Sequence, residues 1–267
     1  MDVTGYLSRI GFPRPAVLDA AALRDLHRAH LLAVPFENLS IHLGERISLE
    51  PGDLLDKIVT RRRGGFCYEL NGAFALLLEA LGGRVVRAAA RVFGGPDARP
   101  GPPFDHLALV VHLADGRPWL ADVGFGSHTV YPLRFDERGE QDDPGGRFQL
   151  VDVPDGDVDV RRNGEPQYRL ERRERTLADF VPTCWWQQTA PESHFRRDTI
   201  CSRLTGDGRI SISGRTLIHT RGGTRTEHQL ADDGELRAAY RDHFGIELDR
   251  LPAAPPQPEP AHDPPLG

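Results

Sequence analysis

The stretch that decides the fold is "RRRGGFCYELNGAFALLLEAL", residues 61–81. A pair of glycines precedes a single cysteine, Cys67, and the apolar residues after it recur with helical spacing as far as Gly82–Gly83. We expect a helix that begins at the cysteine, where unpaired backbone N–H groups and the positive end of the helix dipole favour a thiolate. The glycines before it would let the chain turn sharply and keep the approach to the sulfur open. Cys67 is a candidate nucleophile, although many free cysteines are simply small buried residues.

The residues before this stretch also have helical spacing. In residues 15–34 the apolar positions recur every three or four residues, and Asp19 is placed as the N-cap. Residues 48–62 predict a further helix. We therefore expect residues 1–83 to form a helical domain that carries the nucleophile.

From residue 84 the apolar period changes to about two, which predicts strands. Six short runs, separated by Gly, Pro and Asp turns, predict a small barrel or a strongly curled antiparallel sheet over residues 84–193. Residues 194–251 mix strand patterns with a closing helix. The last segment, 252–267, holds seven prolines and is expected to be disordered.

The composition narrows the class of protein. The 267 residues carry a net charge of −6, which argues against nucleic acid or an anionic membrane as a main partner. No apolar run approaches the roughly 18 residues of a membrane span, and no signal peptide is visible, so we expect a cytoplasmic protein. The three cysteines form no CxxC pair, which argues against disulfides and against a structural metal site.

A base and a carboxylate for the cysteine lie on two neighbouring strand patterns. His106 begins one apolar run and Asp122 lies within the next. If the connecting loop is residues 112–116, the two side chains fall directly opposite each other, about 5 Å apart at Cβ. If Asp115–Gly116 forms a two-residue turn instead, His106 faces Phe125 and the aspartate points to the other face. The sequence leaves both pairings open.

These three residue types together specify one kind of chemistry. A cysteine nucleophile needs an imidazole to share its proton, and the imidazole needs a carboxylate to fix its tautomer and stabilise its charged form. A cysteine at a helix start, with a histidine and a carboxylate on neighbouring strands, is the arrangement of papain-like enzymes. Cys67, His106 and Asp122 are therefore the candidate catalytic residues.

Four motifs, in this order, resemble the arylamine N-acetyltransferase family: "VPFENLSI" (34–41), "RRRGGFCYELNGAF" (61–74), "DHLALVV" (105–111) and "ADVGFG" (121–126). The later "GRISISGRTL" (208–217) resembles its bacterial members, so the resemblance covers most of residues 1–250. It implies an α+β fold with a papain-like thiol-enzyme core, in which a helical domain (1–83), a central antiparallel β-barrel (84–193) and an α/β lid (194–251) surround the triad.

The resemblance also implies a function. Cys67 would accept an acetyl group from acetyl-CoA and pass it to an arylamine or arylhydrazine in a ping-pong reaction, with His106 sharing its proton and Asp122 orienting His106. No cofactor would be bound permanently. The resemblance allows a homodimer and implies a role in xenobiotic metabolism. The residues implied to line the substrate pocket are Phe36, Val92 and Phe125, and those near the coenzyme are Gly124 and Gly126.

Several positions carry further expectations. Glu37 and Arg63 lie in family motifs and are expected to form a buried pair that braces the helix of the nucleophile. Asp105, beside the candidate base His106, adds a negative charge that would raise the pKa of the imidazole or disturb the pocket, and Val130 stands where an aromatic pocket residue is expected. A tryptophan pair, Trp185–Trp186, is expected in the core, with the border of the coenzyme cleft as the alternative.

Three other functions stay open at this point. An amide synthase that releases an aromatic polyketide would use the same triad. A thiol hydrolase or a transglutaminase-like enzyme would share the fold, but the "PFENL" motif argues against it. A protein that binds coenzyme A without turnover would show binding and no acetyl transfer.

Overall fold

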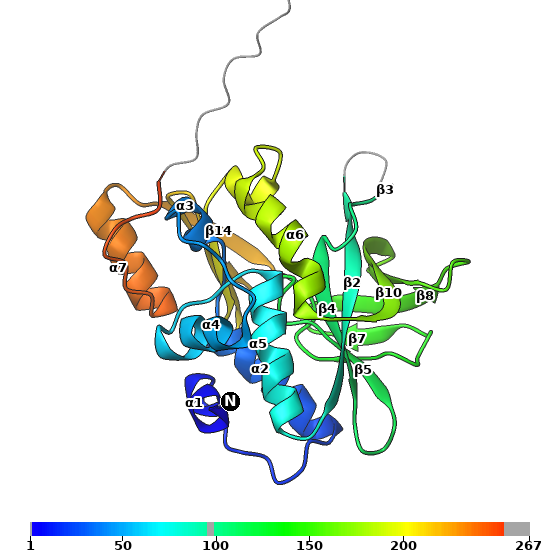
Figure 1. Cartoon of the computed structure of the whole chain (residues 1–267). Helices are drawn as coiled ribbons and strands as arrows, with labels where there is room; N and C mark the ends of the chain where they lie inside the picture. Colours follow the sequence, from blue (N-terminus) through cyan, green and yellow to red (C-terminus); the bar gives the residue numbers. More distant parts are fainter. Residues whose placement is uncertain (1, 95–98, 254–267) are drawn as a thin grey trace, which may run out of the picture.

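The computed structural model describes residues 2–94 and 99–253 of the chain (Figure 1). The tail predicted to be disordered, 252–267, lies outside the described residues except for its first two positions. None of the helices within the described ranges has the length and the apolar character that a membrane crossing needs.

The first third of the chain is helical, as predicted. Its helices are α1 (Val3–Arg9), α2 (Ala20–Ala33), α3 (Leu39–His42), α4 (Pro51–Leu55), a π-helical turn (Asp56–Thr60) and α5 (Cys67–Ala80). The expected N-cap of α2 is confirmed, because the Asp19 carboxylate accepts the N–H of Ala22. The expected α5 is confirmed as well. It begins at Cys67 and ends just before Gly82, whose φ of +93° suits only glycine.

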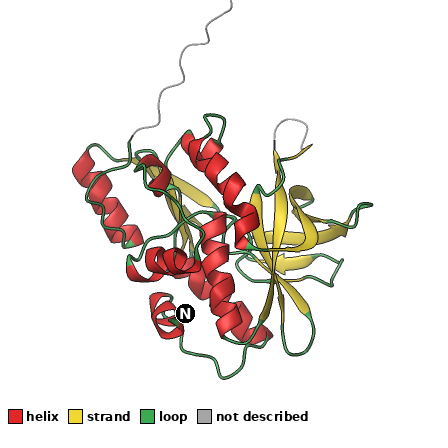
Figure 2. Cartoon of the chain, viewed as in Figure 1, coloured by secondary structure: helices red, strands yellow, loops and turns green. Residues whose placement is uncertain are grey.

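A nine-stranded antiparallel sheet follows, and it curls as the period-two pattern predicted (Figure 2). Along the sheet the order is β6-β5-β4-β2-β10-β9-β8-β7, and β3 pairs with β2. The strands are β2 (Arg84–Gly94), β3 (Arg99–Pro100), β4 (His106–His112), β5 (Pro118–Ala121), β6 (Leu133–Arg134), β7 (Gln141–Asp143), β8 (Gly146–Asp152), β9 (Val158–Arg162) and β10 (Glu165–Arg175). The two end strands are joined by one side chain: the amide of Gln141 bonds both the N–H and the carbonyl of Arg134. The sheet is thus almost a closed barrel.

The last part of the chain builds a second sheet with a helix on it. Its elements are α6 (Leu177–Thr189), a 3₁₀ turn (His194–Arg196), β11 (Ile200–Leu204), β12 (Gly208–Ser213), β13 (Thr216–Arg221), β14 (Thr224–Gln229) and α7 (Asp233–Phe244). A strand from the helical segment, β1 (Phe36–Glu37), pairs with β11 at the edge of this sheet. The fold is the predicted α+β class. The division into three domains stays a prediction. One strand crosses it, because β1 lies in the predicted helical domain but belongs to the second sheet.

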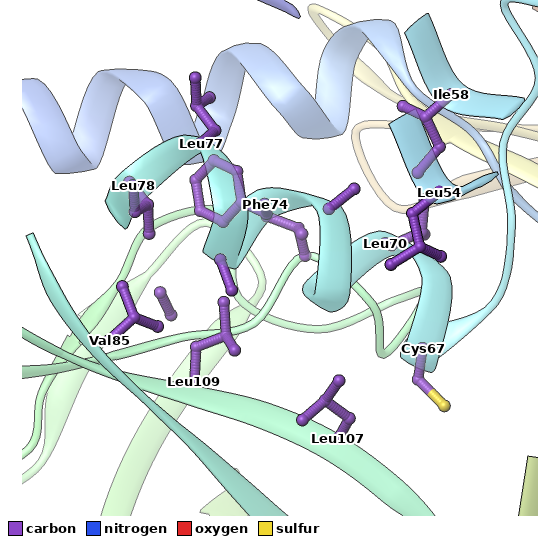
Figure 3. Packing of buried hydrophobic residues seen from close by; sticks show 14 of the residues in the cluster. Leu54, Ile58, Cys67, Leu70, Phe74, Leu77, Leu78, Val85, Leu107 and Leu109 are labelled. Atoms are coloured by element: carbon purple, nitrogen blue, oxygen red, sulfur yellow. The ribbon is translucent and has the colours of Figure 1, made fainter. Parts of the chain in front are cut away.

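Strand β4 connects two cores. Leu107, Leu109 and Val111 pack with α5 in the helical core, while the alternate residues Ala108 and Val110 belong to the core inside the barrel. Figure 3 shows α5 lying over this strand, with the sulfur at the start of the helix pointing away from the packed side chains. The period-two alternation therefore directs His106, which has the parity of Ala108, toward the barrel side.

Candidate active site

Cys67 occupies the first position of α5 and is 3% exposed. The start of this helix is held by Glu69, whose carboxylate accepts the N–H of Phe66 at 3.2 Å. The same carboxylate forms a buried ion pair with Lys57 at 2.6 Å. The position of Cys67 is therefore fixed from the π-helical turn, which lies within the helix predicted over residues 48–62; the pairing of its Lys57 with Glu69 is what sequence reasoning did not identify.

The glycines before Cys67 serve packing rather than turning. A Cβ atom on Gly64 would lie 1.9 Å from the carbonyl oxygen of Pro35, so only glycine lets the β1 segment pass there. The positive φ in this loop, 52°, belongs to Arg62. Gly65 pairs with Phe36 in an isolated parallel bridge, and the expectation that the glycine pair keeps the approach to the sulfur open stays a prediction.

The expected pair of Glu37 and Arg63 is present and buried. An Arg63 guanidinium nitrogen lies 2.9 Å from Glu37 Oε1, and Glu37 Oε2 accepts the N–H of Leu39 at 2.7 Å. Burial alone would raise the pKa of Glu37, but Lys57 and Arg63 lower it below its usual value. The pair joins β1 to the loop before α5, which is the bracing role expected of it.

His106 and Asp122 meet, but by neither of the two expected pairings. The β4–β5 ladder runs from Leu109↔Ala121 to His112↔Pro118, so the hairpin loop is residues 113–117. Its centre lies one residue beyond that of the first alternative. Asp122 consequently lies on the same face as His106 but diagonal to it, and His106 Nε2 reaches Asp122 Oδ2 at 2.7 Å. The two-residue turn, which would have separated the two side chains, is wrong.

Asn71, one turn along α5 from the cysteine, joins the three elements of the site. Its amide nitrogen donates to the carbonyl of Leu107 at 2.6 Å and to Asp122 Oδ1 at 2.8 Å, and its oxygen accepts the N–H of Val123 at 2.9 Å. Sequence reasoning missed this residue. The only local signal was its place four positions after Cys67, on the same face of the helix.

Two pKa shifts define the electrostatics. Burial alone would raise the pKa of Asp122, yet His106, helped by the Asn71 hydrogen bond, brings it well below the usual range. Burial raises the pKa of the Cys67 thiol well above its usual value, and Asp105 and Asp122 act in the same direction, against a backbone hydrogen bond from Leu107. A backbone N–H does favour the thiolate, in the expected direction, but burial outweighs it. The thiol ionises only if a base takes its proton.

Cys67 and His106 open into one cavity of about 340 Å³, a size suited to a small ligand. The residues from the sequence analysis that line it are Cys67, His106, Asp105, Phe36, Val92, Gly124 and Phe125. The lining residues that sequence reasoning missed are Asn38, His194, Phe195, Asp198, Ile200 and Ser213. Most of these come from the C-terminal segment, because the β1–β11 pairing brings it beside Phe36.

Five residues from the sequence analysis have definite places. Gly124 packs against α5, where a Cβ would lie 2.8 Å from the Cα of Cys67, and Gly126 has a φ of +85° and lies against the ring of Phe36. Val130 lines a different cavity. The core prediction for Trp185–Trp186 is wrong, since they are 55% and 41% exposed. The buried face of α6 consists of Phe180, Cys184 and Gln187.

Asp105 is anchored beside the cavity. Its Oδ1 accepts from Gln187 Nε2 at 2.8 Å, and Gln187 Oε1 accepts from Ser193 Oγ at 2.7 Å. Burial raises the pKa of Asp105, against His106 and His194, which lower it. This carboxylate therefore links α6 and the turn after it to the strand of His106.

A second cavity, of about 680 Å³, is basic and lies behind the loop of residues 122–130. Arg28, Arg162 and Arg209 line it together with Ser127 and His128. Arg209 donates to the carbonyl of Gly126 at 2.8 Å, and Arg162 donates to that of Ser127 at 3.2 Å. Burial and the nearby Arg162 lower the pKa of Arg209 to about 10, as expected where like charges gather.

Comparison with known proteins agrees with this geometry. A family model described as N-acetyltransferase matches residues 19–252. Arylamine N-acetyltransferase of Escherichia coli (strain K12) is 33% identical over 251 residues, which cover 91% of this chain and 88% of the relative. The chain belongs to the arylamine N-acetyltransferase family.

Other members of the family match over a similar extent. Arylamine N-acetyltransferase of Mycolicibacterium smegmatis is 36% identical over 263 residues, 94% of each chain. The solved structure of Mycobacterium marinum arylamine N-acetyltransferase in complex with CoA superimposes with a TM-score of 0.84 at 34% identity, and covers 92% of this chain and 93% of that one. The resemblance drawn from the four motifs is confirmed.

Proposed function

We propose that the chain is an arylamine N-acetyltransferase that moves an acetyl group from acetyl-CoA to an arylamine or arylhydrazine through a thioester on Cys67. The observation that carries the proposal is the buried set of Cys67, His106 and Asp122 beside one cavity. The family relatives are named for the same activity. The comparisons do not favour the amide synthase, because these relatives are acetyltransferases.

The first half-reaction needs an activated sulfur. Because His106 Nε2 is bound by Asp122, Nδ1 is the nitrogen left to take the proton of the Cys67 thiol. The thiolate attacks the carbonyl carbon of acetyl-CoA, and the bond from that carbon to the coenzyme sulfur breaks. The departing coenzyme thiolate takes the proton from His106, which leaves an acetyl group on Cys67.

The second half-reaction releases the acetyl group. The nitrogen of the amine attacks the carbonyl carbon on Cys67, loses a proton to His106, and displaces the Cys67 thiolate, which recovers the proton. An aromatic amine is a weak base, so it is neutral and nucleophilic near pH 7. Asp122 stays ionised throughout, because its pKa lies well below the usual range, and it stabilises the imidazolium in both halves.

In this proposal the cavity beside Cys67 binds the aromatic acceptor, and the basic cavity binds the phosphates of coenzyme A. Phe36, Val92 and Phe125 form an apolar wall suited to an aromatic ring. Coenzyme A carries a diphosphate and a further phosphate, and the basic cavity behind Gly126 offers guanidinium groups that suit these anions. Gly124 and Gly126 keep the loop between the two cavities thin. A cytoplasmic location and a homodimer stay predictions.

The test is the intact mass of the protein after mixing with acetyl-CoA and no amine. We expect a gain of about 42 Da that disappears when an arylamine is added. The gain should be absent in Cys67→Ala and retained in Cys184→Ala, a matched control that removes a different buried cysteine. An equal gain in Cys67→Ala would contradict the proposal.

A further inference from the structure

The loop from Asp122 to Val130 begins and ends on one side chain. Nε2 of His27, on α2, accepts the backbone N–H of Asp122 at 3.1 Å. Nδ1 of the same ring lies 3.0 Å from the carbonyl oxygen of Val130. Between these two points the loop carries Gly124 and Phe125, which line the cavity beside Cys67. One imidazole therefore closes the base of the loop that supplies the triad carboxylate.

These contacts fix the ring in one protonation state. A backbone N–H can only donate, so His27 Nε2 is unprotonated, and Nδ1 carries the hydrogen that it gives to Val130. His27 is completely buried, and burial lowers its pKa. The neutral ring offers one donor and one acceptor on a rigid frame, and both are used.

The ring is also set against the helix of the nucleophile. It packs edge-on against Phe74 of α5, with the ring centroids 6.1 Å apart. The carboxylate of Asp122 is held by His106 and Asn71, and His27 holds its backbone from the other side. The position of Asp122 relative to α5 thus depends on a residue that takes no part in lining the cavity of Cys67.

We propose that His27 is a positioning residue of the acetyl-transfer site, which sets the place of Asp122 and of the cavity loop without touching the substrate. The inference rests on the proposed function, because it assigns a role within that triad. Its chemical effect passes through Asp122 to His106 and so to the ionisation of Cys67.

A second buried histidine on the same helix provides the matched control. His30 is also completely buried and also packs against Phe74, with centroids 5.2 Å apart. Its Nδ1 bonds the hydroxyl of Tyr6, in the helical core away from the loop of Asp122. Loss of either ring removes a buried imidazole from α2, but only loss of His27 leaves the backbone N–H of Asp122 and the carbonyl of Val130 without their partner.

The experiment compares His27→Leu and His30→Leu by melting temperature, by kcat and KM, and by the pH profile of Cys67 alkylation with iodoacetamide. For His27→Leu we expect alkylation at pH 7 and kcat/KM to fall by about 10- to 100-fold, with the alkylation profile moved to higher pH. For His30→Leu we expect a comparable loss of melting temperature with the wild-type profile. The alkylation profile is the readout that a purely structural role would not move.

Two conservative variants keep the test decisive if His27→Leu does not fold. His27→Asn places its amide near Nδ1 and keeps the Val130 contact, whereas His27→Gln reaches the place of Nε2 and keeps an acceptor for Asp122. The profile should move further for Asn than for Gln. Wild-type profiles in both would overturn the proposal. If wild-type protein gains no acetyl group while alkylation still depends on His27, the proposed function fails and the positioning role stands.

Discussion

At the residue scale, the polar side chains around Cys67 bond mainly to one another and to nearby backbone groups. Asn71 uses three hydrogen bonds to connect α5, β4 and the loop of Asp122, and Glu69 uses its carboxylate both as a helix cap and as the partner of Lys57. Because a buried polar atom without a partner costs about 1–3 kcal/mol, each such contact fixes geometry as well as stability. Burial raises the pKa of the Cys67 thiol, so the proposed mechanism needs His106 as its base.

Arg28 provides the residue-scale prediction. It lines the basic cavity behind Gly126, where we place the phosphates of acetyl-CoA. Arg28→Ala should raise KM for acetyl-CoA by about three- to tenfold with little change in kcat, because a partly exposed charge contributes about 1 kcal/mol. Steady-state kinetics at low and high salt measure this, and the effect should shrink as salt screens the charge.

The control for this prediction is Arg84→Ala, which removes the same charge from an exposed ion pair with Glu174. It should leave KM for acetyl-CoA unchanged. If Arg28→Ala has the wild-type KM at low salt, the phosphates do not bind in this cavity.

At this scale the sequence could predict the residues that stand in recognisable motifs. Cys67, His106 and Asp122 stand in short motifs with chemistry that pairs them, and they do lie together. His27 and Gln187 act through contacts with residues 95 and 82 positions away. No local pattern distinguishes such a residue from an ordinary core or surface residue, because its partner is set by the packing of whole elements.

At the element scale, two buried ion pairs hold the segment before α5. Removing one partner of such a pair leaves an uncompensated buried charge, which typically costs about 3–5 kcal/mol. Arg63→Met should therefore lower the free energy of unfolding by about that amount at pH 7, as measured by urea denaturation. The double variant Glu37→Gln with Arg63→Met should be less destabilised than Arg63→Met alone, because neither charge of this pair is left.

An exposed pair supplies the comparison for this prediction. Arg225 and Glu227 are paired at 2.6 Å with side chains 61% and 51% exposed. Arg225→Met should change the unfolding free energy by less than about 1 kcal/mol. If Arg63→Met also lowers the unfolding free energy by less than about 1 kcal/mol, Glu37 is neutralised by protonation or by Lys57 instead.

The β4–β5 hairpin shows how far an element can be predicted. The chemistry of a triad requires His106 and Asp122 on one face, and the structure keeps that parity. The loop length was not predictable, because the Asp115–Gly116 pair lies inside a five-residue loop in which Gly116 has a φ of +77°. A turn signal marks where the chain reverses, but the packing of β4 against α5 decides the register.

At the scale of the whole molecule, the change of apolar period at residue 84 was sufficient to separate helices from barrel. The order of the strands was not predictable, because it depends on which pairs of runs meet across long loops. The same holds for β1, two residues that join the C-terminal sheet and bring its segment to the cavity. The helical and sheet cores are thus joined at the site, where β4 belongs to both.

This shared interior contains buried histidines, and His128 is the clearest case. Its ring packs among Phe125, Phe148 and Tyr168, and its two nitrogens have no hydrogen-bond partner among the described residues. Burial lowers its pKa to about 3, with Asp122 opposing the shift and His106, Arg162 and His27 adding to it. Between pH 3 and 6.5 the unfolded chain therefore binds a proton at this position that the folded protein does not.

Acid should consequently destabilise the protein through His128. The unfolding free energy should fall by about 1.4 kcal/mol per pH unit below about pH 6.5, which makes about 2 kcal/mol at pH 5. In His128→Leu this part of the acid slope should vanish, whereas the exposed His228→Gln should keep the wild-type slope. Urea unfolding at pH 7.5, 6 and 5 measures the difference, and the other titrating groups cancel because all three proteins share them. Equal slopes in wild type and His128→Leu would mean that His128 binds its proton as readily in the folded protein as in the unfolded chain, and would contradict the prediction.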